Sequence, residues 1–353
     1  MKSHIEPDAI LEEVRGRTNV FSPPTYFDPP KASAAELLKY GFSLEPDPVA
    51  APDRYASWMR LFSQKLKFVD ADFALPPLPQ PQRPGHRRQP AVNRLHQEKS
   101  LNWCGAYVSA KGARTFSEIH ADWTVPRPTA PIDPESGRAR DGDYRSSTWI
   151  GFDGQRRYLN SSLPQIGTAQ EVVVVDGERT CKIYAWVQWW VRDHRSIPVV
   201  LSSLPISAGD QVICSMVAMS GTTVRFYIKN QTTGVFVSPF ELSAPLFHPP
   251  QGGKPVQLEV SGATAQWIME RPAALTEGHQ LYELPDYGKV TFGNCYAVSS
   301  SHKIEKPERL SGARLIDMRA IREHPHRSAI ISRSRLVGPQ QLMVSYGNRV
   351  AAV

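Results

Sequence analysis

The sequence predicts a mainly β protein with antiparallel strands. From Asn102 to about Ser301 the chain carries short β-branched and aromatic runs in which side chains alternate with a period of two. Turn signals such as Asp153-Gly154 and Asp176-Gly177 separate these runs. The 31 prolines among 353 residues exclude a mainly helical chain. Short strands at such close spacing indicate an antiparallel sandwich or barrel.

Residues 1–72 form a separate, helical region in this prediction. Ser33-Ala34-Ala35-Glu36 is a capping box that opens a short helix, and Gly41 ends it. A second helix follows, in which apolar residues recur at helical spacing and form a face that needs a partner surface. This face is expected to carry Tyr55, Met59, Phe62 and Leu66.

The regions flanking the strand-rich part are rich in basic residues. Residues 73–101 combine prolines with arginines and are predicted to be an extended linker. Residues 102–301 form the β domain, and residues 302–353 are expected to be a basic tail with one possible strand, "QQLMVSYG". The net charge of +7 is concentrated in these flanking segments, which favours solvated chain over a specific nucleic-acid site.

Composition also limits cofactors, partners and location. The four cysteines are far apart and show no zinc-like spacing, so two disulfides and four free thiols both remain open. His324 and His326 are expected to be exposed side chains, and no metal site is predicted. No segment has the apolar length of a signal peptide or a membrane span, so we expect no membrane partner. A monomer is expected, and the route to any substrate outside the cell stays open.

Two strands carry the candidate chemistry. In "YAWVQWWV", alternation places Tyr184, Trp186, Gln188 and Trp190 on one face, which is either a second packed face or the floor of a groove. In "ATAQWIMERP", Trp267 and Met269 share one face, whereas Ile268 and Glu270 share the other. Taken alone, Glu270 reads most simply as an exposed residue at a strand end.

The surrounding fragments change that interpretation. From Asn102 to Asn294 they follow one another in the order and spacing of the glutamic peptidases, or eqolisins, and the chain therefore resembles that family. The fragments are "NWCGAYV", "ADWTVPRP", "STWIGFDG", "LPQIG", "YAWVQWW", "GDQVICSMVAMSG", "KNQTTG", "AQWIME" and "YGKVTFGN".

The resemblance implies a two-layer antiparallel, concanavalin-like β-sandwich and an acid-type endopeptidase that uses no metal or cofactor. It places the catalytic glutamine at Gln165 and the catalytic glutamate at Glu270. The residues expected to bind the polypeptide substrate are Trp103, Trp149, Asp153, Trp186 and Gln188. It also implies that residues 1–101 could act as a basic propeptide, with the alternative of an unrelated helical module on a linker.

This pair of residues suits peptide hydrolysis. An ionised Glu can take a proton from water and return it to the leaving amine, and a Gln amide can donate to the developing oxyanion. The alternative function is a catalytically silent sandwich that binds carbohydrate or peptide on its aromatic groove. A sugar-binding module would need the aromatic rings but not Gln165 and Glu270.

Two departures from the family pattern affect the expected pH range. Gln188 stands where many family members carry Glu, and Ala169 stands where the fungal pattern has Asp. Fewer neighbouring carboxylates mean less like-charge repulsion, and therefore less upward pressure on the pKa of Glu270. We expect activity closer to neutral pH than the usual acidic range of the family.

Overall fold

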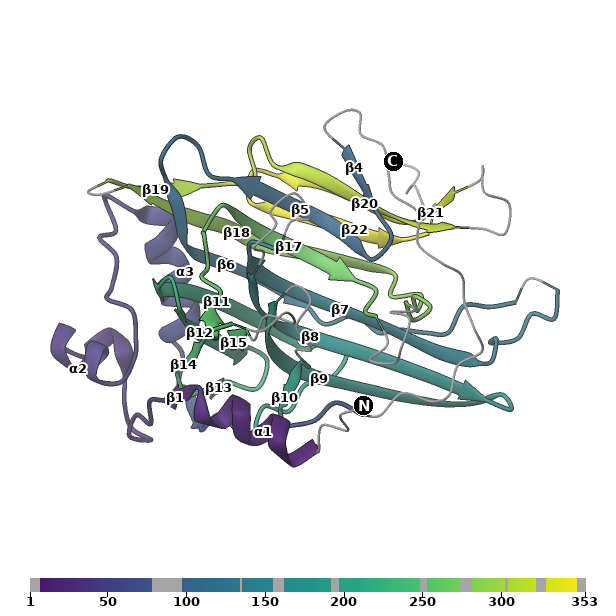
Figure 1. Cartoon of the computed structure of the whole chain (residues 1–353), viewed down its shortest axis with the longest axis horizontal. Coiled ribbons are helices and arrows are strands. Elements are labelled where there is room, and N and C mark those ends of the chain that lie inside the picture. The colour runs from purple at the N-terminus through teal and green to yellow at the C-terminus, as the bar shows by residue number, and fades with distance from the viewer. Residues whose placement is uncertain are drawn as a thin grey trace.

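The computed structural model describes residues 7–77, 97–133, 135–154, 162–191, 197–247, 253–273, 281–301, 304–321 and 328–347. Within these residues the chain is mostly antiparallel strand, and the long strands run side by side across the molecule (Figure 1). The prediction of a mainly β protein is confirmed. The predicted linker falls mostly outside the described residues, as do His324 and His326.

The first layer of the sandwich carries Gln165 and Glu270. Its central strands are long and antiparallel, with Glu270 opposite Ser147 and Gln165 opposite Gln188. In order across the sheet the layer consists of β10 (Val199–Leu201), β9 (Glu178–Val191), β8 (Ser162–Val175), β7 (Gly142–Phe152), β17 (Thr264–Glu270) and β5 (Trp103–Ser109).

The second layer packs behind the first, and three C-terminal strands join the two. The second layer consists of β18 (Lys289–Ser301), β6 (Thr115–Thr124), β11 (Gln211–Ser220), β12 (Thr223–Asn230), β13 (Val235–Val237) and β14 (Phe240–Ser243). Pairing then runs from β5 through β20 (Arg314–Ile321), β21 (Ser328–Gly338) and β22 (Gln341–Tyr346) to β18. The short strands β4 (Gln97–Ser100) and β19 (Ile304–Glu308) pair with β20 and β18, and β15 (Leu246–Phe247) pairs with β16 (Val256–Gln257).

The sequence predicted a basic tail after residue 302, and this prediction is wrong. The strands β20 to β22 of this segment complete the path between the layers and bury Met318, Leu342 and Val344 in the core. Of the arginines on these strands, Arg314 and Arg335 are exposed, and Arg319 and Arg333 are partly buried. The one strand predicted in this segment, "QQLMVSYG", is confirmed as β22.

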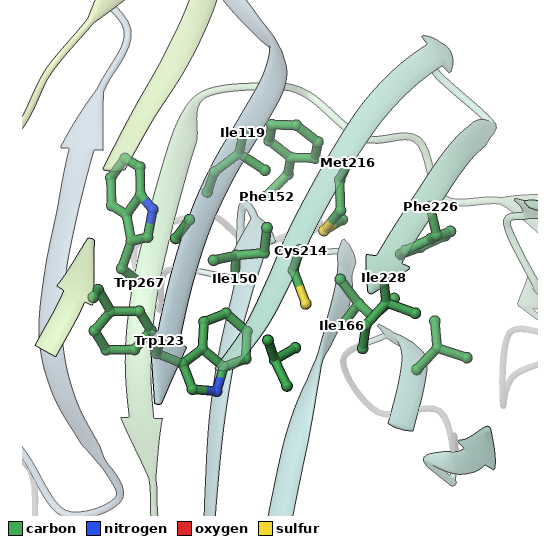
Figure 2. Packing of buried hydrophobic residues seen from close by; sticks show 14 of the residues in the cluster. Ile119, Trp123, Ile150, Phe152, Ile166, Cys214, Met216, Phe226, Ile228 and Trp267 are labelled. Carbon is green, nitrogen blue, oxygen red and sulfur yellow. The ribbon is translucent and has the colours of Figure 1, made fainter. Parts of the chain in front are cut away.

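The core lies between the inner faces of the two layers (Figure 2). Ile150, Ile166 and Trp267 from the first layer pack with Cys214 and Phe226 from the second. Alternation therefore predicted the faces correctly: Trp267 points into the core, and Ile268 belongs to a different cluster on the outer face. All four cysteines are free, and three of them are buried.

The N-terminal region is built into both layers. Its strands β1 (Thr18–Val20) and β2 (Lys67–Val69) extend the second layer by pairing with β14 and β13, and β3 (Phe73–Ala74) pairs with the edge strand β10 of the first layer. Its helices are α1 (Pro7–Gly16), the 3-10 helix η1 (Pro29–Lys31), α2 (Ala34–Lys39) and α3 (Pro52–Phe62). The capping box of α2 is present as predicted.

Helix α3 covers the outer face of the second layer. Phe62 is fully buried, and its ring lies 5.6 Å from that of Tyr227 and 5.9 Å from that of Phe236. The buried face contains Trp58, Leu61 and Phe62, whereas the predicted Tyr55 and Met59 are only partly buried. Because α3 ends at Phe62, Leu66 packs from the segment that follows.

Polar contacts also fix α3 to the second layer. The ammonium group of the fully buried Lys229 donates to the carbonyls of Arg60 and Leu61 at 3.2 Å, at the C-terminal end of the helix, where a cation is favoured. Burial lowers the pKa of Lys229 to about 8. Arg54 forms a 2.7 Å ion pair with Glu118. Strand pairing, aromatic packing and ion pairs together predict that this region stays bound without a covalent link.

A cut between the N-terminal region and β4 tests that prediction. We expect a protease site engineered within residues 78–96 to give two chains that co-elute in native gel filtration and separate only in denaturant. The control combines this site with Phe62→Ala, which removes a buried aromatic worth about 3–5 kcal/mol and should weaken retention. If the N-terminal chain instead separates from the rest of the cut protein in buffer, the prediction is wrong and the region is a removable propeptide.

Candidate active site

The carboxylate of Glu270 is held by three N–H donors at the end of β17. Its Oε1 accepts from Asn102 Nδ2 and from Trp103 Nε1, both at 3.1 Å. Its Oε2 accepts from Trp149 Nε1 at 2.9 Å. The two indole rings meet edge to face, with centroids 5.3 Å apart. Neighbouring strands supply these donors, because Trp103 lies on β5 directly opposite Glu270 and Trp149 lies on β7 opposite Ile268.

The orientation of Asn102 follows from its own contacts. The Ser100 hydroxyl donates to Asn102 Oδ1 at 3.1 Å, so the amide nitrogen faces Glu270. The backbone N–H of Arg271 donates to the Asn102 carbonyl at 2.7 Å, and its guanidinium donates to the Leu101 carbonyl at 2.8 Å. The sequence analysis gave Asn102 no role in the site and named it only as the first residue of the fragment "NWCGAYV". Its position next to Trp103 was the signal that could have identified it.

Burial raises the pKa of Glu270 from 4.5 to about 7. The three N–H donors act in the opposite direction because they favour the ionised form. No carboxylate among the described residues contributes to this rise in pKa. This agrees with the sequence, in which Gln188 and Ala169 stand at positions where the family pattern has acidic residues. The increase itself was not expected from the sequence, because it comes from enclosure by the aromatic side chains rather than from like charges.

Gln165 lies on the same outer face, two strands away from Glu270. It is buried, and its Nε2 donates to Gln188 Oε1 at 2.7 Å. Its own Oε1 is buried and has no hydrogen-bond partner among the described residues. In register, Gln165 is opposite Gly151 and Glu270 is opposite Ser147, so Trp149 stands between them. Both residues therefore face one surface with an indole between them.

Trp186 belongs to the aromatic cluster on this outer face. It is 4% exposed, and its indole N–H is buried and finds no hydrogen-bond partner within the part of the chain that the structure describes. The cluster comprises Tyr107, Trp149, Leu163, Trp186, Ile268 and Ile316, with Trp103 and Trp190 packed against it. The sequence left open whether the aromatic strand forms a packed face or the floor of a groove, and for Trp186 the structure shows a packed face.

Two glycines make room for this arrangement. A Cβ at Gly167 would lie 2.1 Å from the carbonyl oxygen of Thr148 and 2.7 Å from Cβ of Trp149. A Cβ at Gly105 would lie 2.1 Å from the carbonyl oxygen of Trp267. The glycines in "LPQIG" and "NWCGAYV" therefore let β8 and β5 approach the strands that carry Trp149 and Glu270.

Asp153 is not brought to Glu270. It lies at the opposite end of β17, where its carboxylate accepts from the backbone N–H groups of Ser261, Gly262 and Ala263 at 2.6, 3.1 and 2.8 Å. The Ser261 hydroxyl donates to the same group. Its expected contact with substrate is thus replaced by a positioning role, because it holds the turn that starts β17.

The outer face of the first layer thus carries a partly buried carboxylate, that of Glu270, held by three N–H donors. A model described as the Peptidase A4 family matches residues 101–346, and the chain therefore belongs to this family, the glutamic peptidases. The resemblance found in the sequence is confirmed, and the chain is a peptidase that acts on polypeptides. No curated protein sequence matches the chain.

Solved glutamic peptidases resemble the structure at low identity. Scytalido-glutamic peptidase with a transition state analogue inhibitor is 19% identical, with a TM-score of 0.49, over 70% of this chain and 98% of that chain. SCP-B, an eqolisin in complex with the tripeptide Ala-Ile-His, is 18% identical, with a TM-score of 0.46, over 70% and 98%. Aspergilloglutamic peptidase from Aspergillus niger is 23% identical, with a TM-score of 0.42, over 57% and 99%.

The described residues were also compared with the requirements of a metal site and of a membrane-spanning helix. Among them, no three His, Cys, Asp or Glu side chains gather as metal ligands would. No helix in the described parts of the chain combines the length and apolar character needed to cross a membrane.

Removing one donor from Glu270 should raise its pKa further. We expect Trp103→Phe, which keeps the aromatic packing but removes an N–H, to raise the pKa of Glu270 by about one pH unit above that of the wild type. The measurement is an NMR titration of glutamate side-chain carboxyl carbons, assigned with Glu270→Gln. Trp267→Phe is the matched control, because Trp267 is on the same strand but donates to the His120 carbonyl in the core. An unchanged titration in Trp103→Phe would contradict the role of the indole.

Proposed function

We propose that the chain cleaves extended polypeptides with Glu270 as general base and Gln165 as oxyanion donor. The observation that carries this proposal is the Glu270 carboxylate, which has three N–H donors and a pKa raised to about 7. A general base is most effective when its pKa lies near the working pH. Glu270 would take a proton from water as the water attacks the peptide carbonyl, and would then return that proton to the leaving amine.

The amide of Gln165 can supply the donor that the oxyanion needs. In the present orientation one of its N–H groups is directed at Gln188. Because residue 188 is also an amide, both side chains can turn over together, so that Gln188 donates to Gln165 Oε1 and both N–H groups of Gln165 become available. An ionised Glu at residue 188 could only accept, and would keep Gln165 in one orientation. Gln188 thus supports the proposed role.

A carbohydrate-binding module is less well supported. Stacking on sugars needs exposed aromatic rings, but Trp149 is fully buried and Trp186 is nearly so. The indole N–H of Trp149 is directed at Glu270, as expected for a group that orients a catalytic carboxylate.

Substitution of the two residues tests the mechanism. We expect Glu270→Gln to lower kcat for casein-derived peptides by about 10²–10⁴, the range of general acid–base catalysis. Gln165→Ala should lower kcat by about 10²–10³, as for loss of one oxyanion donor. The controls are Glu178→Gln and Gln257→Ala, which alter exposed residues of the same types on β9 and β16. Pepstatin in every assay excludes contaminating aspartic peptidases. Retention of activity in Glu270→Gln would disprove the mechanism.

The pH profile gives an independent test of the same carboxylate. Because the base must be ionised, kcat/KM should rise with pH along a limb with an apparent pKa near 7 and fall about tenfold for each pH unit below it. The measurement is kcat/KM for a fluorogenic peptide between pH 3 and pH 9. The limb near neutral pH follows from burial of Glu270, because missing carboxylates alone would lower its pKa and move the limb to lower pH. A maximum below about pH 3 would contradict the assignment of Glu270 as the base.

A further inference from the structure

A buried ionic cluster lies beside Glu270 on the outer face of the first layer. Arg145 donates through Nε and Nη2 to the two oxygens of Asp143 at 2.8 and 3.0 Å, and through Nη1 to Glu171 Oε1 at 2.9 Å. The Tyr184 hydroxyl donates to the same oxygen of Glu171 at 2.6 Å. Arg145 is 8% exposed, and its guanidinium lies 4.3 Å from the centroid of the Tyr282 ring. We name Asp143, Arg145, Glu171 and Tyr184 the Arg145 cluster.

Strand register places this cluster one step from the catalytic carboxylate. Glu270 pairs with Ser147, and Arg145 is two residues from Ser147 on the same face of β7. Two residues of a strand correspond to about 7 Å, the length of two residues in an extended peptide. Because β17 ends at Glu270, the strand does not continue beside Arg145, and Tyr282 lies there instead.

The chain's own N-terminal region already places a peptide carbonyl on this cluster. The carbonyl oxygen of Pro77 accepts from Arg145 Nη1 at 3.4 Å. Residue 77 closely follows β3, which pairs with β10 at the edge of the layer, whereas Arg145 is on β7 beyond β9 and β8. The segment 75–77 therefore extends from the sheet edge towards the centre of its outer face. At 3.4 Å the hydrogen bond is long and correspondingly weak, so another carbonyl can replace it.

We propose that Arg145 binds a backbone carbonyl of the polypeptide substrate, about two residues from the scissile bond, at the position now taken by Pro77. This inference rests on the proposed peptidase function and adds a substrate-binding group that the family resemblance did not assign. The buried ion pairs with Asp143 and Glu171 hold the guanidinium rigidly, so little conformational entropy is lost when a carbonyl binds. The segment 75–77 competes with substrate for the same N–H.

Arg145→Lys tests the proposal because it keeps the charge but removes the guanidinium fork. We expect KM to rise about tenfold for a peptide that extends at least three residues on both sides of the scissile bond, with little change in kcat, since a hydrogen bond from a charged donor is lost. For a peptide truncated to one residue on each side, KM should be the same in wild type and variant. A merely structural role would affect long and short peptides equally.

Arg225→Lys is the matched control. Arg225 is also 8% exposed, donates through Nε and Nη2 to Glu241 at 3.1 and 2.6 Å, and lies 4.9 Å from the Phe21 ring centroid, but it belongs to β12 of the second layer. It should reproduce any loss of thermal stability caused by an Arg→Lys change at such a site, without a change in KM for either peptide. An equal increase of KM in both variants would overturn the proposal.

Two further measurements keep the proposal testable if Arg145→Lys folds poorly or if the chain hydrolyses nothing. Pro76→Gly with Pro77→Gly loosens the competing segment and should lower KM for the long peptide only. In the Glu270→Gln background, calorimetry of the long peptide should give a Kd about tenfold higher when Arg145→Lys is added. Absent hydrolysis with this Kd difference intact would reject the catalytic proposal alone, whereas equal Kd values would reject the role of Arg145.

Discussion

Enclosure of one carboxylate among aromatic side chains is the constraint on which the site depends. Transfer of an ionised Glu from water into such surroundings is costly, and the raised pKa of Glu270 expresses that cost. The donors from Asn102, Trp103 and Trp149 offset part of it and leave a group that can ionise near neutral pH. Without them the pKa of Glu270 would be raised further.

Much of the first layer serves to bring these donors together. Gly105 and Gly167 allow β5 and β8 to approach β17 and β7 more closely than any side chain would permit. Arg271, which follows Glu270, fixes the backbone of Leu101 and Asn102. Asp153 holds the start of the same strand. The two ends of β17 are thus fixed by different polar contacts, and the central residues Trp267 and Ile268 are packed on opposite sides.

The regions outside the central strands contribute to the same face. The segment that precedes β5 supplies Asn102. The C-terminal strands connect the two layers, and the carbonyl of Pro77, which follows the N-terminal region, accepts a hydrogen bond from Arg145. Four positions of β7 follow one another at intervals of two residues. They are Gly151, which is opposite Gln165, then Trp149, then Ser147, which is opposite Glu270, and finally Arg145. That interval matches the repeat of an extended chain.

The sequence by itself determined the mainly β class and the faces of the strands that carry Trp186 and Trp267, and it predicted Glu270 as the catalytic glutamate. These follow from local alternation and from fragments in order, and such patterns depend on neighbours along the chain. It did not determine that the basic segment after residue 302 forms strands, because arginines on exposed strand faces have the same composition as a solvated tail. It likewise placed Asp153 in the site and overlooked Asn102 and Arg145. Only the tertiary structure decided where these three side chains lie, because the pairing of strands distant in sequence determines which polar groups meet and which apolar groups enclose a charge.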